Sequence, residues 1–331
     1  MASRLGRTIN VFFMMLGIGL LVWLLLHLDA EEIADRLIQV GWYFPFAFLA
    51  YTFANVITTY SWKEIVDPSQ SKARYRDFLA AFWAGHAVNA LTPGGSLGEV
   101  FRGNIMRGKV NGEEIVASLM ILYFMNTLAV NLFTLVGPLA CLLLADLPVD
   151  VVLILFGIAV LFFVPVILMF IMLRLGAAHK LVWLLSRIPF VKLKDPDGLM
   201  DKARSIDQKV RNFRKARPRA FARALVCLFS VRLFQVAEVW IVLMALVSGQ
   251  ESGQLLLLAF LTQTASQLIA WGLAFVPGQM GVAEGGSALL FKWLGMDPLT
   301  GLSMELVRRI RKVIGISIGL LLGVLVGLRK R

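Results

Sequence analysis

Cysteine, histidine and charged side chains are all scarce in this chain of 331 residues. The two cysteines, Cys141 and Cys227, lie inside apolar runs, which excludes a disulfide framework and is typical of small buried side chains. The three histidines, His27, His86 and His179, are scattered and form no set of metal ligands. We therefore expect no metal site and no bound cofactor.

Patterns of catalytic residues are also missing. No Ser/His/Asp or Cys/His set is arranged for nucleophilic attack, and no phosphate-binding loop follows a strand. The glycine-rich stretch Thr92-Pro93-Gly94-Gly95 does not match a nucleotide-binding motif. The sequence predicts that the protein is not an enzyme.

Charged residues make up 16% of the chain, whereas soluble domains average about 25%, and 58% of the residues are hydrophobic. The apolar residues form blocks, several of which reach the roughly 20 residues that a helix needs to cross a bilayer. The first block follows Arg4 and Arg7 but lacks a small-residue cleavage site, so we interpret it as a retained span. We predict an all-α integral membrane protein with six full spans, over Ile9–Leu28, Trp42–Trp62, Glu113–Leu144, Val151–Leu173, Phe221–Val247 and Asp297–Leu328.

Two further apolar segments are predicted to enter the membrane and return as re-entrant helical hairpins. Phe78–Leu91 is too short to cross, at about 21 Å, and ends in a turn that contains Pro93 and Gly94. Leu255–Val276 leads into a similar turn and a short return over Ser287–Leu294. An alternative for the second segment is that Leu255–Val276 crosses alone, which would move the C-terminus to the other side.

The net charge of +12 is explained by the positive-inside rule rather than by nucleic acid, since no nucleic-acid-binding module is present. The basic segment 175–222 and the tripeptide Arg329-Lys330-Arg331 fall on one side under the predicted topology. We predict a multi-pass protein of the cytoplasmic (inner) membrane with both termini cytoplasmic. A narrow apolar stripe within the basic segment, over 199–213, fits a helix that lies on the inner leaflet or one that packs on the protein's own spans.

The two halves of the chain share features at an offset of 184 residues, which carries Pro93 onto Pro277. We predict a single transmembrane domain over 1–331, with a first repeat over 1–145 and a second over 146–331 that holds the insertion 175–222. Three full spans in each half is an odd number, so the repeats should be inverted. Inverted repeats with broken helices are typical of transporters.

Charged residues within the predicted membrane segments are the main candidates for function, because each costs free energy unless it has a partner or faces a cavity. We expect Arg102, Arg308 and Arg309 to bind phosphate. Arg232 and Glu238 lie on one span, and an ion pair between them is the favoured interpretation. The glycines of the turns could offer free backbone N–H groups to an anion. The candidate binding residues are Pro93, Gly94, Gly98, Glu99, Arg102, Arg232, Glu238, Pro277, Gly278, Gly281, Glu284, Arg308 and Arg309.

The two turns resemble those of the transmembrane region of the lysylphosphatidylglycerol synthase family, also called flippase-like domain proteins. The first turn carries Pro93, Gly94, Gly98, Glu99 and Arg102, and the second Pro277, Gly278, Gln279, Met280, Gly281 and Glu284. Gln279 and Ala283 stand where the family pattern has glycine and arginine. The aminoacyl-transferase domain of some members does not follow before Arg331, so lipid aminoacylation is not implied.

The resemblance implies translocation of an anionic lipid or lipid-linked headgroup between leaflets, with membrane lipids as the partners. Two alternatives stay open. One is a secondary transporter of a small soluble anion, and the other is a non-transporting subunit that docks a lipid-modifying enzyme through 175–222. A homo-oligomer is compatible with each of these three functions.

Overall fold

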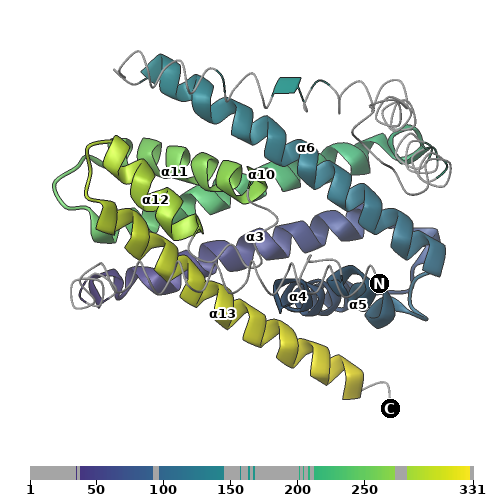
Figure 1. Ribbon diagram of the computed structural model, residues 1–331. Coiled ribbons are helices and arrows are strands. Elements are labelled where there is room, and N and C mark those ends of the chain that lie inside the picture. Colours follow the sequence, from purple (N-terminus) through teal and green to yellow (C-terminus); the bar gives the residue numbers. More distant parts are fainter. Residues whose placement is uncertain are drawn as a thin grey trace, which may run out of the picture. The chain divides into compact units, whose positions relative to one another are not determined.

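The computed structural model describes residues 38–91, 97–144, 212–272 and 282–328, and the isolated positions Asp35, Gly157, Phe163, Val164, Ile167, Asp201, Arg204 and Gln208. These residues are almost entirely helical, and no strand is assigned within them beyond isolated bridges at Val110. The helices are α3 (Tyr43–Ile65), α4 (Tyr75–Leu91), α5 (Leu97–Met106), α6 (Gly112–Leu144), α10 (Pro218–Leu246), α11 (Ser252–Gly272), α12 (Val282–Trp293) and α13 (Pro298–Leu328), with a short 3₁₀ turn η1 (Pro68–Gln70) (Figure 1).

The bounds of these helices lie close to the apolar segments predicted from the sequence. The prediction of an all-helical chain is therefore confirmed for the described residues. By length and composition, Gly112–Val136 and Pro218–Leu246 qualify as candidate membrane spans within the described part. The predicted first and fourth spans, Ile9–Leu28 and Val151–Leu173, fall outside it, as does most of the segment 175–222.

Two compact units divide the chain. Unit 1 takes Met1–Val56, Leu79–Ile105 and Val231–Arg331, and unit 2 takes Ile57–Phe78 and Met106–Ser230. Each unit draws on both predicted repeats, and the inverted relation between the repeats stays a prediction.

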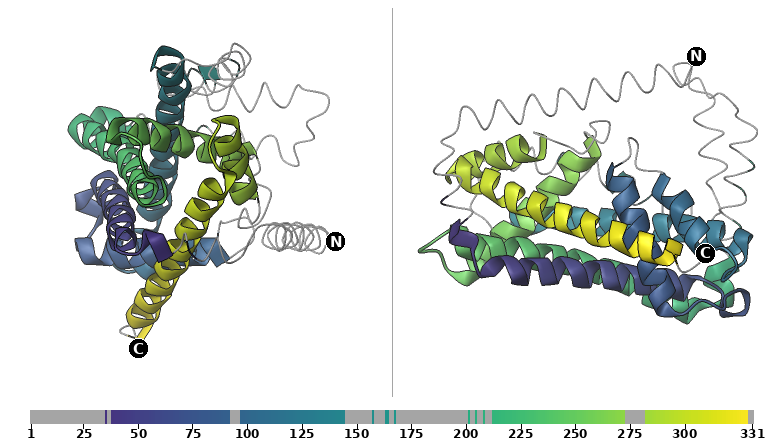
Figure 2. Two further views of the ribbon diagram at one scale, coloured as in Figure 1. Left: turned by 90° about the vertical axis from the view of Figure 1, so that its left-hand side faces the viewer. Right: turned by 90° about the horizontal axis from the view of Figure 1, so that it is seen from below.

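The turn between α12 and α13 follows the chemistry expected of it. The N–H of Met296 donates to the carbonyl of Phe291 at 2.9 Å, and Gly295 adopts a φ of 71°, which together close a Schellman motif. Asp297 then accepts from the N–H of Leu299 at 3.0 Å, and Pro298 occupies the first helical position. The predicted start of the last helix at Asp297 is confirmed. The returning chain brings α12 against α13, with α11 beside α12 (Figures 1 and 2).

Glycines at every fourth position of α13 allow other helices of unit 1 to approach closely. A Cβ at Gly319 would collide with the carbonyl oxygen of Trp83 on α4. One at Gly323 would meet the Cβ of Ala84 at 3.3 Å, and one at Gly315 would meet the hydroxyl of Tyr51 at 3.0 Å. Small residues four apart are the usual means by which membrane helices bring their backbones together.

Apolar side chains remain exposed along the last turns of α13. Leu321, Val324 and Leu325 are each more than half exposed. A helix that is apolar on its outer face and packs through glycine on its inner face suits a lipid surrounding, because such surface is unfavourable in water.

Unit 2 is held together by backbone caps and ion pairs around the loop between α3 and α4. Arg217 donates to the carbonyl of Val66 at 2.9 Å, beyond the end of α3. Glu114 accepts from the N–H of Asp67 at 2.8 Å, and Lys109 pairs with Asp77 at 2.6 Å. The bonds made by Arg217 and Glu114 satisfy backbone groups that would otherwise be unpaired beyond the end of α3.

We expect Gly319→Val to weaken the fold, because the added side chain must displace the backbone of α4. The free energy of unfolding should fall by about 1–3 kcal/mol. Thermal unfolding of the purified protein in detergent measures the change. Gly253→Val is the matched control, since a Cβ at Gly253 meets nothing within 4 Å. Equal melting temperatures for the two variants would contradict the close packing of α13 on α4.

Candidate functional site

The first predicted hairpin places three of the candidate residues together at the start of α5. Glu99 pairs with Arg102 at 2.9 Å, one helical turn away. Asn89 on α4 accepts from the N–H of Gly98 at 2.6 Å and donates to Glu99 at 3.2 Å. A Cβ at Gly98 would overlap the carbonyl oxygen of Gly85, so glycine is required for this approach of α5 to α4.

Arg102 is 7% exposed, and its guanidinium lies over the ring of Phe82 at 4.5 Å from the centroid. The ring of His86 stacks on the same Phe82 ring, with an interplanar angle of 8°. The Nε2 of His86 lies 3.2 Å from the hydroxyl of Tyr51 on α3. Arg102 of α5 thus connects through Phe82 and His86 to Tyr51.

The second group of charges forms where α11, α12 and α13 meet. Glu284, in the first turn of α12, is 1% exposed and pairs with Arg309 on α13. Glu305 pairs with Arg308 at 2.9 Å and accepts from the hydroxyl of Ser287 at 3.1 Å. The carboxylate of α12 and both predicted arginines of α13 are therefore brought together.

Polar side chains of α11 complete this group. Ser266 donates to Glu305 at 3.1 Å and lies 3.3 Å from Arg308. Gln263 accepts from Arg308 at 3.0 Å through its Oε1. Its Nε2 donates to Gln235 on α10 at 3.3 Å. The four helices are linked by hydrogen bonds at one place.

Glu238 on α10 is 1% exposed and belongs to unit 1. Its carboxylate accepts a hydrogen bond from Arg311 and lies 3.9 Å from the Nε of Arg308. The expected pair between Arg232 and Glu238 is wrong, since Arg232 donates instead to Gln235 at 2.9 Å. The reason is helical geometry: side chains six residues apart point roughly 120° away from each other, whereas those three apart are neighbours.

Tyr51 joins the two groups of charges. The guanidinium of Arg311 lies 4.1 Å from the centroid of its ring, and its hydroxyl contacts His86. Cation–π contacts of this kind gain strength where water is excluded. A continuous chain of contacts therefore runs from Glu99 and Arg102 to Glu238.

A cavity of about 220 Å³ opens beside the second group. Its wall carries four cationic side chains and two carboxylates, with amide and hydroxyl groups between them. The lining residues are Gln235, Gln263, Ser266, Gln267, Ala283, Glu284, Glu305, Arg308, Arg309, Arg311 and Lys312.

Residues 10–319 match the model of the lysylphosphatidylglycerol synthase transmembrane region. The chain belongs to this family. The resemblance of the two turns to the lysylphosphatidylglycerol synthase family is thereby confirmed, and so are a membrane location and a lipid-related role. Comparison with curated proteins and with solved structures gives no match.

Five of the predicted binding residues lie outside the part of the chain that the structure describes, namely Pro93, Gly94, Pro277, Gly278 and Gly281. The backbone N–H donors expected from the glycines among them therefore stay a prediction. Of the remaining candidates, Gly98, Glu99 and Arg102 gather in the first turns of α5, and Glu284, Arg308 and Arg309 at the cavity. Glu238 lies beside the cavity group, and Arg232 is tied to it through Gln235.

Sequence reasoning missed the polar side chains of α11 and the role of Tyr51. Gln263, Ser266 and Gln267 occur within an otherwise apolar segment at spacings of three and four, which places them on one face of a helix. That polar stripe was a usable signal. The sequence around Tyr51 gives no such signal, because a single tyrosine in an apolar helix most often only packs against its neighbours.

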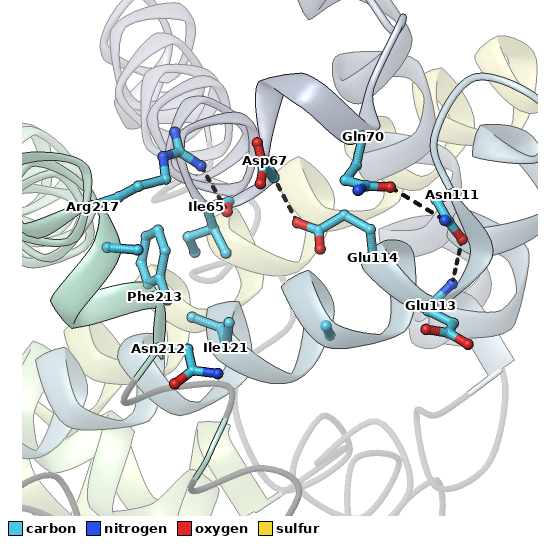
Figure 3. Close-up of a pocket in the computed structure, with 12 residues that line it drawn as sticks. Ile65, Asp67, Gln70, Asn111, Glu113, Glu114, Ile121, Asn212, Phe213 and Arg217 are labelled. Atoms are coloured by element: carbon cyan, nitrogen blue, oxygen red, sulfur yellow. Dashed lines mark hydrogen bonds between the residues drawn. The ribbon is translucent and has the colours of Figure 1, made fainter.

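A second cavity, of about 380 Å³, lies in unit 2 and is shown in Figure 3. Its charged wall consists of Asp67, Glu113, Glu114 and Arg217. Arg217 is engaged with the carbonyls at the end of α3, and hydrogen bonds from Ser69 hold the pKa of Asp67 below its usual value. With carboxylates in excess, this cavity is unsuited to an anionic headgroup.

The pairing of Glu238 with Arg311 should be measurable as a stability coupling. We expect Glu238→Ala to lower the free energy of unfolding by about 3 kcal/mol, because it leaves Arg311 buried without its anion. The double variant Glu238→Ala/Arg311→Met should recover part of that loss.

A double-mutant cycle on thermal unfolding in detergent measures the coupling, which should reach about 1 kcal/mol or more. Glu251→Ala is the control, because Glu251 is exposed at the start of α11. Simple additivity of the two single variants would contradict the pair.

Proposed function

We propose that this protein is a flippase-like transporter that moves an anionic lipid or lipid-linked headgroup between the leaflets of the cytoplasmic membrane. The observation that carries the proposal is the cavity of unit 1, where four cationic side chains line a space among apolar helices of a lipid-related membrane family. Cations at such a place are costly unless they have a partner or a ligand.

The proposed architecture has six full spans and two re-entrant hairpins arranged as an inverted repeat, with both termini cytoplasmic. The short helix pairs α4–α5 and α11–α12 would be the two hairpins, each followed by a long helix, α6 or α13. What supports this is the position of a glutamate in the first turn of both α5 and α12, each paired with an arginine.

The mechanism that we propose is an exchange of anions. Glu99 and Glu284 hold Arg102 and Arg309 while no lipid is present. A phosphate that enters can replace the carboxylate on the guanidinium. The planar carboxylate and the tetrahedral phosphate can each accept two parallel N–H bonds from an arginine. The acyl chains would stay in the surrounding lipid.

The role is proposed to be binding and translocation rather than catalysis. The polar side chains at the cavity are engaged in ion pairs and hydrogen bonds, and the carboxylate that accepts from Ser266 and Ser287, that of Glu305, is held by Arg308. Membrane lipids are the proposed partners. A transporter of a small soluble anion would use the same cavity, whereas an enzyme-docking subunit would depend on 175–222.

We expect the purified full chain to accelerate exchange of a fluorescent anionic phospholipid in proteoliposomes, scored by dithionite quenching of the outer leaflet. Arg309→Met should slow the exchange about tenfold, because a charge-assisted hydrogen bond to the phosphate is lost. Arg309→Lys should retain part of the rate.

Arg219→Met serves as the matched control, since Arg219 is exposed and lies outside the cavity. Each variant is first checked for a monodisperse elution profile. Removal of 175–222 and uptake of inorganic phosphate test the two alternatives. If no lipid among several headgroups exchanges faster than in empty liposomes, the flippase proposal fails.

A further inference from the structure

Two glutamate–arginine pairs in unit 1 have the same composition but opposite burial. In the pair on α5, Glu99 has 44% of its side chain exposed and Arg102 has 8%. In the pair between α12 and α13, the side chain of Glu284 is 1% exposed and that of Arg309 is 25% exposed. At the cavity the arginine is therefore the more accessible partner, and its carboxylate is enclosed.

This difference in burial matters when an anion draws the arginine away from its carboxylate. Water can hydrate Glu99 once Arg102 is engaged elsewhere, because nearly half of the glutamate side chain is exposed. The carboxylate of Glu284 is enclosed by protein, and an enclosed carboxylate that loses its cation is strongly destabilising. An anion can therefore bind Arg309 at low cost only if another group stabilises Glu284.

Lys312 is in the right place to be that group. It stands one turn after Arg309 on α13, and side chains three apart on a helix are neighbours. It lines the same cavity as Glu284. Among the described groups that act on its charge, Arg308, Arg309 and Arg311 repel it and the carboxylate of Glu284 attracts it. The lysine is thus drawn toward the glutamate that Arg309 holds.

The other cations of the cavity wall already hold other carboxylates. Arg308 pairs with Glu305, and Arg311 pairs with Glu238. The ion pairs of the described residues do not include Lys312. Helix α11, which packs on α12, has no ionisable residue in its sequence. Lys312 is therefore the cation of this wall that can receive a displaced carboxylate without breaking a second pair.

The pair on α5 has no equivalent of this lysine. The residue three positions after Arg102 is Ile105, an apolar side chain that is 7% exposed. The residue three positions after Arg309 is Lys312. A second cation therefore follows the arginine whose glutamate is enclosed, and an apolar residue follows the arginine whose glutamate is exposed.

A lysine suits a contact that forms and breaks. Its ammonium is a point charge on a flexible four-carbon stem, whereas a guanidinium is a planar fork with a fixed geometry. Because Arg309 and Lys312 are neighbours on one helix, a change of partner by Glu284 requires rotation of side chains rather than a new position of α12 or α13.

We propose that Lys312 is a positioning residue, which binds the carboxylate of Glu284 when Arg309 turns to an anion. In the occupied state Lys312 contacts Glu284 and not the anion. This inference rests on the proposed function for the anion that draws Arg309 away, whereas the change of partner can be measured without any ligand.

The variant Arg309→Met imitates the occupied state, because it removes the cation from Glu284 in the absence of a ligand. Thermal unfolding of the purified full chain in detergent should show that Lys312 matters mainly in this background. Lys312→Met alone should lower the melting temperature by less than about 2 °C, but in the Arg309→Met background by about 5 °C or more. Lys312→Arg in that background should cause no such loss.

Two comparisons show whether the effect acts through Glu284. In the Glu284→Gln background no carboxylate needs a cation, so the effects of Arg309→Met and Lys312→Met should be additive. Lys292→Met is the matched control, because Lys292 is exposed on α12 and lies outside the cavity. A monodisperse elution profile for Arg309→Met that is lost in Arg309→Met/Lys312→Met has the same meaning as the difference in melting temperature.

Calorimetric binding of dioctanoyl phosphatidylglycerol and dioctanoyl phosphatidic acid to the purified full chain tests the same role with an anion present. Lys312→Met should weaken the binding of each probe about tenfold, because the occupied state then leaves Glu284 without a cation. In the Glu284→Gln background the same replacement should weaken binding by less than about threefold. If neither probe binds, the melting temperatures alone decide.

Equal losses of affinity in the two backgrounds would mean that Lys312 binds the anion directly, and would overturn the inference. Additive effects of Arg309→Met and Lys312→Met while Glu284 is present would overturn it too, as would an Arg309→Met variant that does not fold. The expected melting temperatures without any lipid exchange would support the change of partner and remove the transport role. Lipid exchange with additive melting temperatures would leave the proposed function standing without this role of Lys312.

Discussion

The burial of Glu238 among the arginines of α13 is the constraint on which the rest of unit 1 depends. A carboxylate that is 1% exposed needs compensation, and Arg311 and Arg308 provide it. The pairing fixes α13 against α10. Arg311 also lies on the ring of Tyr51, so the same guanidinium ties α3 to the group. A single helix, α13, thus positions the charges that line the cavity.

The packing of α13 makes this arrangement possible because the helix has different faces for different neighbours. Its glycines allow α4 and α3 to approach, while Arg308, Arg309 and Arg311 extend toward α10, α11 and α12. Its outer face is apolar toward the end, where Leu321 and Val324 are exposed. Close backbone packing brings the neighbouring helices near enough that few polar groups are left open to lipid. The charged cavity is therefore a consequence of small residues as much as of charged ones.

Most of the helices could be predicted from the sequence, because apolar runs and their ends are local signals. Asp297 and Pro298 mark the start of α13, and the structure has the cap that those residues predict. The pair of Glu99 with Arg102 follows from their spacing. The partner of Glu238 does not, since Arg311 is contributed by a helix far along the chain and no periodicity relates the two. The polar stripe of α11 gains its meaning only when α13 lies beside it.

A cavity whose carboxylates are already paired has a consequence for transport. Under the proposed exchange, an entering anion replaces one carboxylate on a guanidinium, and the cation stays compensated before and after, provided that the displaced carboxylate is hydrated, protonated or held by a second cation. The free-energy difference between the empty and occupied states is then small compared with the cost of burying an unpaired charge. Small differences of this kind allow a carrier both to bind and to release its ligand.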